Sequence, residues 1–321
     1  MSHLSHIAFL FPGQGSQKVG MGKALCDTSA RARAVFEEAD GILGFSLSRL
    51  CFEGPEAELT LTANAQPAIL ATSVAALRVL EDETPLRPRV VAGHSLGEYA
   101  ALVAAGALAF GDAVRLVHLR GKFMQEAVPP GVGAMAAILG LGAAEAEAAC
   151  EDARRACPGE IVSPANLNGA GQIVIAGHKR AVEAACAAAK SRGAKRALPL
   201  AVSAPFHCEL MRPAADRLAA ELARVEVRPP TIPVVANVDA TPNLDAGRVR
   251  DLLTRQVTAT VRWEESVQRL ASMEVTGAVE LGQGTVLAGL CRRIAPTIDI
   301  HSVGDPAAVG SLAAVAKGAW S

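Results

Sequence analysis

The sequence predicts an α/β protein in which a parallel sheet flanked by helices is interrupted by a smaller domain. Short apolar runs that end in turn residues alternate with helical stretches along most of the 321 residues, as is typical of a parallel sheet with helices on its faces. Between about residues 133 and 203 the order becomes strand, helix, strand, strand, helix, strand. Helix-breaking residues stand at both edges of this stretch, in Pro129–Gly131 and Ser203–Pro205, where domain linkers usually lie.

The expected strands of the parallel sheet are apolar runs followed by glycine or polar residues. They cover Ile7–Gly13, Val90–Ser95, Pro233–Val238, Gly277–Gly282 and Ile300–Val303. The interrupting stretch has the βαββαβ order of a ferredoxin-like domain. Its expected elements are the strand Ala134–Leu139, the helix Ala143–Ala156, the strands Ile161–Leu167 and Gln172–Ala176, the helix Lys179–Arg192 and the strand Ala197–Leu200. We therefore expect a large domain of residues 1–128 and 204–321, an insert of residues 129–203, and a cleft between them.

Composition and charge argue against several classes of protein. The net charge of -1 gives no general attraction to nucleic acid. The longest apolar run, Tyr99–Phe110, is shorter than the roughly 20 residues of a membrane-spanning helix. The apolar start at Ile7–Phe11 has no basic segment before it, which indicates a strand and not a signal peptide, and predicts a cytoplasmic protein. The seven cysteines include no Cys-x-x-Cys pair, so we expect reduced, buried thiols and no metal site.

One motif points to a nucleophile, namely Gly93-His94-Ser95-Leu96-Gly97, which lies between an expected strand and an expected helix. This context is that of a nucleophile elbow, in which glycines allow a tight turn and present the serine at a helix N-terminus. The exposed N–H groups and partial positive charge of that terminus favour a reacting oxygen. Ser95 is therefore the expected nucleophile. Glu98 follows in the first helical turn, where it has either a role of its own or only a favourable interaction with the helix dipole.

An oxyanion site and a general base can be placed beside this elbow. Gly13 and Gly15 bracket Gln14 at the end of the first expected strand, so the Gln14 N–H can face outward and form a pair of donors with the Leu96 N–H. An ordinary turn between a strand and a helix is the alternative. His207 is the best-placed histidine, because it follows directly after the insert and therefore lies beside the expected cleft. A purely structural histidine is the alternative there.

Arg120 is a charged residue on an apolar helix face. The helix expected from Asp112, as its N-cap, to about Ala127 has an apolar stripe on which Arg120 alone carries charge. A buried arginine requires an anionic partner, because an unpaired buried charge costs about 3–5 kcal/mol. That partner is either an Asp or Glu of the chain or a substrate carboxylate, which the planar guanidinium can bind through two oxygens.

Seven ordered motifs, spread over nearly the whole chain, resemble the malonyl-CoA:acyl-carrier-protein transacylases of fatty-acid or polyketide synthesis. The motifs are Phe11–Gln17, Gly93–Glu98, Arg120-Gly121 with Met124-Gln125, Gly133–Met135, Gln172–Ile175, Ala204–His207, and Gln256-Val257 with Val261–Trp263. The resemblance implies a hydrolase-like large domain around a ferredoxin-like insert. It leaves open whether the pathway is that of fatty acids or of polyketides.

The resemblance also implies site roles. Ser95 would carry the malonyl ester, His207 would be the base, and Arg120 would bind the malonyl carboxylate. Gln14 and Leu96 would supply the oxyanion donors.

Two more residues take a role only from the resemblance. Gln256 would orient His207, and Phe206 would crowd an α-methyl branch, so that malonyl is preferred to methylmalonyl. The implied reaction moves a malonyl group from malonyl-CoA to the phosphopantetheine thiol of an acyl carrier protein in a ping-pong cycle. No bound metal or redox cofactor is implied, and we expect a monomer. A methylmalonyl donor stays an alternative.

Two other functions fit parts of the sequence. A serine esterase or thioesterase would use the same elbow and histidine. No Asp or Glu between Ser95 and His207 stands out, however, as the third catalytic residue that such hydrolases have in this chain order. A non-catalytic module that binds carrier proteins would form no acyl-enzyme. Reaction with malonyl-CoA separates the three functions.

Overall fold

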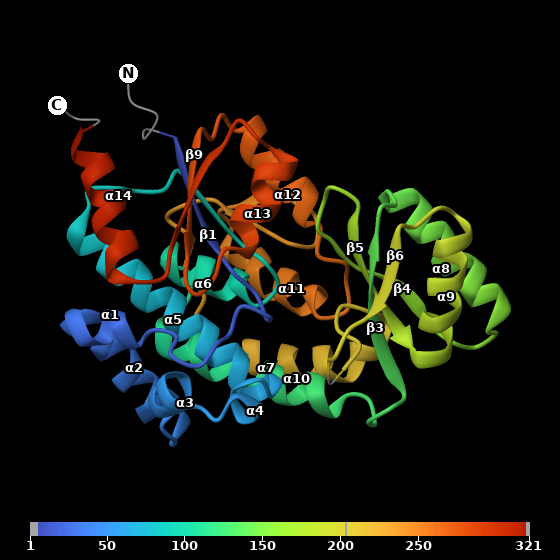
Figure 1. Ribbon diagram of the computed structural model, residues 1–321. Helices are drawn as coiled ribbons and strands as arrows, with labels where there is room; N and C mark the ends of the chain where they lie inside the picture. Colours follow the sequence, from blue (N-terminus) through green and yellow to red (C-terminus); the bar gives the residue numbers. More distant parts are fainter. Residues whose placement is uncertain (1–5, 203, 319–321) are drawn as a thin grey trace.

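The structure, a computed structural model, describes residues 6–202 and 204–318. It contains two sheets with helices packed on them (Figure 1). Within these residues the larger sheet has six strands in the order β10-β9-β1-β2-β7-β8, and the smaller sheet has four in the order β4-β5-β3-β6. Ser203, the expected end of the interrupting stretch, lies outside the described residues.

The larger sheet and its helices come from two segments of the chain. The first segment contains β1 (Ile7–Phe11), α1 (Lys23–Thr28), α2 (Ala30–Leu43), α3 (Leu47–Glu53), α4 (Glu56–Leu59), α5 (Thr62–Glu83), β2 (Val90–Gly93), α6 (Gly97–Ala104) and α7 (Phe110–Glu126). The second contains the short 3-10 helix η1 (Glu209–Met211), α10 (Arg212–Leu222), β7 (Val234–Val235), β8 (Pro242–Asn243), α11 (Ala246–Gln256), α12 (Trp263–Ser272), β9 (Gly277–Leu281), α13 (Val286–Ile294), β10 (Asp299–Val303) and α14 (Pro306–Gly318).

β1, β2 and β9 are buried along their whole length, which explains their largely apolar sequences. β1 pairs in parallel with β2 and β9. Because alternate residues of a strand face opposite sides, Phe9 and Phe11 join a core shared with α2, α5, α6 and α7, whereas Ala8 and Leu10 join a second core shared with α12 and α13. The carboxyl ends of these strands are thereby fixed between two helical layers.

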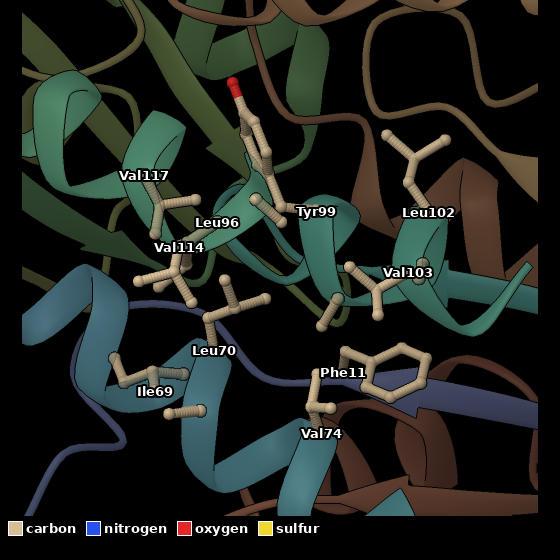
Figure 2. Close-up of a cluster of buried hydrophobic side chains, with 14 of the residues drawn as sticks. Phe11, Ile69, Leu70, Val74, Leu96, Tyr99, Leu102, Val103, Val114 and Val117 are labelled. Atoms are coloured by element: carbon tan, nitrogen blue, oxygen red, sulfur yellow. The ribbon is translucent and has the colours of Figure 1, made fainter. Parts of the chain in front are cut away.

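α5 is the central helix of the first core, and it packs against α6 and α7. Figure 2 shows side chains such as Leu70, Tyr99 and Val117 converging from these three helices near the end of β1. Gly121 of α7 allows the α5 and α7 backbones to approach, since a Cβ at this position would lie 2.5 Å from the Thr62 carbonyl oxygen. The two helices are therefore in close contact where α5 begins.

A hydrogen bond strengthens the same contact. Pro67 lies inside α5 and has no N–H to donate to the Ala63 carbonyl. The ring of His118 on α7 supplies the missing donor, with Nδ1 2.8 Å from the Ala63 oxygen. This bond fixes the parts of the two helices that carry Gln66 and Arg120.

The smaller sheet lies between the two segments in sequence and has its own core. Its elements are β3 (Gly133–Leu139), α8 (Ala143–Ala156), β4 (Val162–Leu167), β5 (Gln172–His178), α9 (Lys179–Ser191) and β6 (Arg196–Pro199). All three strand pairs are antiparallel. The order and types of these elements agree with the sequence prediction, and their ends differ from it by no more than one or two residues.

Two predictions for the large part were wrong. The expected strand Pro233–Val238 is reduced to β7, and β8 pairs with β7 in the antiparallel direction, so the sheet is not wholly parallel. The strand ends early because the Asn237 N–H donates to the Glu98 side chain and not to a neighbouring strand. Asp112 is not the N-cap of α7, because the helix begins at Phe110, which packs against the core. Asp112 lies instead in the first turn.

All seven cysteines are free, and all except the half-buried Cys186 are buried. In the described ranges, no helix combines the length and the apolar character that a membrane crossing requires. No group of three His, Cys, Asp or Glu side chains in the same ranges is placed to hold a metal ion.

Candidate active site

A cavity of about 630 Å³ is lined by loops and helices around the larger sheet and by residues of the smaller sheet. Its lining includes five of the residues expected at the site, namely Gln14, Ser95, Arg120, Phe206 and His207. The other two, Leu96 and Gln256, are fully buried behind this lining. The structure therefore brings together residues that are far apart in sequence.

The turn that carries Ser95 is tight and strained. Ser95 has a φ of 51°, in the left-handed region that few residues other than glycine adopt. A side chain at Gly93 would collide with the backbone of Gly97, and one at Gly97 would collide with the Phe11 carbonyl. The two glycines are therefore required for β1, β2 and α6 to approach one another at this point.

Ser95 and His207 form a hydrogen bond. The distance from Ser95 Oγ to His207 Nε2 is 2.7 Å, and His207 Nδ1 lies 2.8 Å from the main-chain oxygen of Gln256. Because a carbonyl can only accept, Nδ1 carries the proton, and Nε2 is left to accept the serine proton. Gln256 thus holds the histidine through its main-chain oxygen.

The surroundings of His207 favour the neutral ring. Burial, and then the positive charge of Arg120, lower the pKa of His207 to about 3. The imidazole is therefore uncharged at neutral pH and has a free lone pair toward Ser95.

Arg120 is 2% exposed, and its hydrogen-bond partners are neutral. Nη1 lies 2.8 Å from Gln66 Oε1, and Nη2 lies 2.9 Å from Gln256 Oε1 and 3.1 Å from Ser95 Oγ. Among residues 6–202 and 204–318, no Asp or Glu forms a hydrogen bond or ion pair with it, and its Nε has no partner. Of the two anionic partners that the sequence left open, an acid of the chain is thus not in contact with this guanidinium.

Glu98 is the acid connected to Arg120, and the side-chain amide of Gln256 lies between them. Glu98 Oε2 accepts hydrogen bonds from Gln256 Nε2 at 2.8 Å and from the Asn237 N–H at 3.1 Å. Burial raises the pKa of Glu98 to about 7, although these hydrogen bonds and Arg120 oppose the shift. Burial likewise lowers the pKa of Arg120. The Gln256 side chain therefore connects a buried acid to a buried cation.

The main-chain N–H groups of Gln14 and Leu96 are the two expected oxyanion donors. The Ser95 N–H donates to Asn237 Oδ1 at 2.6 Å. In the part of the chain that the structure describes, by contrast, the Gln14 and Leu96 N–H groups donate to no protein acceptor. The loop with Gln14 passes close to the elbow, since a Cβ on Gly13 would lie 2.5 Å from the His94 oxygen. Both N–H groups are free for an oxygen of a ligand.

Comparison with known proteins identifies the family. The acyl transferase domain family matches residues 8–294. The malonyl CoA-acyl carrier protein transacylase of Salmonella typhimurium is 50% identical over 308 residues, which cover 96% of this chain and 99% of that protein. Its counterpart in Bacillus subtilis strain 168 is 48% identical over 303 residues, which cover 94% and 95%. The chain belongs to the malonyl CoA-acyl carrier protein transacylase family.

Solved structures agree with this family assignment. An acyl carrier protein S-malonyltransferase from Vibrio cholerae matches with a TM-score of 0.93 and 48% identity, over 96% of this chain and all (100%) of that one. A malonyl-transacylase in complex with a type II polyketide synthase acyl carrier protein also has a TM-score of 0.93 and 48% identity, and the match covers 97% and 100% of the two chains. The resemblance inferred from the motifs is confirmed.

Sequence reasoning missed three residues of this transacylase site. Asn237 brackets the elbow, because its side chain accepts from the Ser95 N–H and donates to the Gly93 carbonyl at 2.7 Å. Gln66 accepts from Arg120, and Asn168 Oδ1 accepts from His94 Nε2 at 2.8 Å. Asn237 could have been suspected, because it lies near the carboxyl end of the expected strand Pro233–Val238, at the sheet edge where ligands bind.

Proposed function

We propose that this chain transfers a malonyl group from malonyl-CoA to the phosphopantetheine thiol of an acyl carrier protein through an ester on Ser95. The observation that carries the proposal is the hydroxyl of Ser95 in contact with both His207 and Arg120 at the cavity. The curated relatives are named for this transfer, and one solved relative is a complex with an acyl carrier protein.

The first half-reaction forms the ester. His207 Nε2 takes the Ser95 proton while Oγ attacks the thioester carbonyl carbon. The C–S bond then breaks, and His207 gives the proton to the departing sulfur of coenzyme A. In the second half-reaction the phosphopantetheine thiol passes its proton to His207 and attacks the ester. The bond from the acyl carbon to Ser95 Oγ breaks, and Oγ takes the proton back.

Backbone donors would stabilise both tetrahedral intermediates. The free N–H groups of Gln14 and Leu96 are the candidates, and the loss of one such donor costs on the order of 3 kcal/mol at the transition state. Gln256 keeps the proton of His207 on Nδ1 through its main-chain oxygen. This tautomer is the one that the attack of Ser95 requires.

Arg120 would bind the carboxylate of the malonyl group. Its partners are amide oxygens and a hydroxyl, so a substrate carboxylate would be the first anion in direct contact with it. Phe206 lines the same cavity beside His207 and would limit the space for an α-methyl branch. The reaction needs no bound metal or redox cofactor.

We also propose that residues 129–203 form a ferredoxin-like domain inserted into a hydrolase-like domain of residues 1–128 and 204–321. The element order, the strand order β4-β5-β3-β6 and the separate core support the insert. The parallel pairing along β10-β9-β1-β2-β7 and the elbow after β2 support the larger domain. A cytoplasmic location and a monomeric state stay predictions from the sequence.

A thioesterase is the second candidate, and the surroundings of His207 argue against it. Hydrolases with this elbow orient the histidine with an Asp or Glu. Here Nδ1 donates to a main-chain carbonyl of Gln256.

Intact-protein mass spectrometry after mixing with malonyl-CoA tests the proposal. We expect a malonyl adduct that persists and then moves to added holo acyl carrier protein, and no adduct on Ser95→Ala. Free malonate with rapid turnover would indicate a thioesterase. No reaction at all would indicate a module that only binds carrier proteins.

A further inference from the structure

Glu98 is a buried carboxyl group that the reaction described above does not use. It lies in the first turn of α6, three positions after Ser95, and it is 3% exposed. The residues that line the cavity do not include it, so it does not touch a substrate there. Its Oε2 nevertheless accepts two hydrogen bonds from residues that contact the reacting groups. This acid is therefore more than a favourable charge at a helix end.

The first hydrogen bond determines which way the Gln256 amide faces. Nε2 of Gln256 donates to Glu98 Oε2 at 2.8 Å and to the Ser95 carbonyl at 2.9 Å. Oε1 is thereby turned toward Arg120 Nη2, which it meets at 2.9 Å. If the amide were reversed, its oxygen would face two acceptors and its NH₂ group would face a guanidinium that can only donate. Glu98 therefore selects the orientation in which Gln256 supports Arg120.

The second hydrogen bond fixes the segment behind the elbow. Glu98 Oε2 accepts the Asn237 N–H at 3.1 Å. The Asn237 side chain in turn accepts from the Ser95 N–H at 2.6 Å and donates to the Gly93 carbonyl at 2.7 Å. One oxygen atom thus anchors both the residue that aims the guanidinium and the residue that holds the strained turn of the nucleophile.

We propose that Glu98 is a positioning residue for the transfer reaction, which acts through Gln256 on Arg120 and through Asn237 on Ser95. This inference rests on the roles proposed above for Ser95 and Arg120. The required property is an acceptor oxygen at the right reach from α6, and the negative charge is secondary. An acid that only complements the helix dipole would require the charge, and its reach would not matter.

Two substitutions separate these properties. Glu98→Gln keeps an acceptor oxygen at the same reach and removes the charge, whereas Glu98→Asp keeps the charge and withdraws the oxygen by one methylene group. We expect E98Q to form the malonyl adduct within about threefold of the parent rate in single-turnover mass spectrometry. We expect E98D to be about a hundredfold slower, because small displacements of positioning groups have effects of this size. The opposite order of the two variants would overturn the proposal.

A second readout concerns substrate preference. Because Gln256 supports Arg120, E98D should also lose much of its preference for malonyl-CoA over acetyl-CoA, whereas E98Q should keep it. The same two substitutions at Glu145, in the first turn of α8, are the matched control and should leave both rate and preference unchanged. If E98D does not fold, a loss of tenfold or more in E98Q alone overturns the proposal.

A double-mutant cycle tests the route through Gln256. The further loss that E98D causes in a Q256M background should be much smaller than the loss that it causes in the parent, because Gln256→Met already removes the support of Arg120 and only the route through Asn237 remains. Losses that multiply would show an independent structural effect and overturn the route. Ser95→Ala separates this outcome from a failure of the proposed function. A malonyl adduct on S95A would contradict the proposed function itself. An inactive S95A together with a fully active E98D would contradict only the positioning role of Glu98.

Discussion

The cavity lining from the larger-sheet part differs in chemistry from the lining contributed by the smaller sheet and the loop after it. The first includes Ser95, Arg120 and His207, which are joined by hydrogen bonds. The second has no charged side chain and combines apolar residues such as Val174 and Leu200 with amides such as Asn168. Proton transfer and charge therefore belong to one part, whereas the other part lines the cavity with uncharged side chains. Substitutions of Ser95, Arg120 and His207 should lower rates, whereas substitutions in the second lining should have small effects.

The largest effect is expected at His207. His207→Ala leaves Ser95 without an acceptor for its proton and should slow adduct formation about a thousandfold, within the range of general-base catalysis. Single-turnover mass spectrometry measures this rate. Val174→Ala is the control from the second lining and should change it by less than about threefold. If H207A lost less than tenfold, another group would be taking the proton, and the contrast between the two linings would fail.

The next effect is expected at Arg120 and depends on the substrate. Arg120→Ala should lower kcat/KM for malonyl-CoA at least about a hundredfold more than for acetyl-CoA. The reason is that burying the malonyl carboxylate without its cationic partner costs about 3–5 kcal/mol of binding free energy. Parallel assays with the two thioesters give the ratio. Thermal unfolding is the control, because the substitution also leaves the oxygens of Gln66 and Gln256 without a donor. Equal losses for both substrates would contradict the carboxylate role.

Local patterns in the sequence were sufficient for the features that depend on neighbouring residues. The elbow was predictable because Gly93 and Gly97 flank a serine between a strand and a helix, and Ser95 indeed has a φ of 51°. The burial of Arg120 was predictable from the helical period of α7, and its side chain is 2% exposed. The elements of the smaller sheet followed from their periodicity in the same way.

The contacts between distant segments could not be read from such patterns. Asn237 holds the elbow across 142 positions of sequence. The Asn237 N–H donates to Glu98, and this second contact ends β7 earlier than its apolar run suggested. Gln66 meets Arg120 only because α5 and α7 touch at Gly121. Gln256 was expected from the family resemblance, but its main-chain oxygen, and not its amide, contacts His207. A main-chain contact of this kind leaves no signature in the side-chain sequence.

A smaller effect is expected at Phe206, which sharpens the comparison because it is apolar yet belongs to the larger-sheet part. Phe206→Ala should raise kcat/KM for methylmalonyl-CoA relative to malonyl-CoA about tenfold, the effect expected for space equal to one methyl group. Competition between the two thioesters measures the ratio. Val174→Ala also enlarges the cavity and serves as the control. If it relaxed the preference equally, selectivity would depend on total volume and not on the position beside His207.

The smallest effect is expected from pH. Burial and the charge of Arg120 lower the pKa of His207 to about 3, and His94 adds a smaller contribution in the same direction. A base with a lowered pKa stays neutral as the pH falls, so the rate of malonylation should change by less than about twofold between about pH 8 and pH 5.5. A histidine with its ordinary pKa near 6.5 would lose about tenfold over this range.

Glu98 is the other group that could affect this profile, because its pKa is raised to about 7. Protonation on one oxygen leaves the other as an acceptor for Gln256 and Asn237, so the positioning role predicts no step at this pH. Arg120→Ala should raise the pKa of His207 only in part, because burial, the larger cause of its lowered pKa, remains. If the parent itself lost activity with a midpoint near pH 6.5 or 7, either His207 would not be shielded or the charge of Glu98 would matter. If E98Q no longer loses activity at low pH, the loss in the parent is due to Glu98. If E98Q still loses activity at low pH, the loss is due to His207.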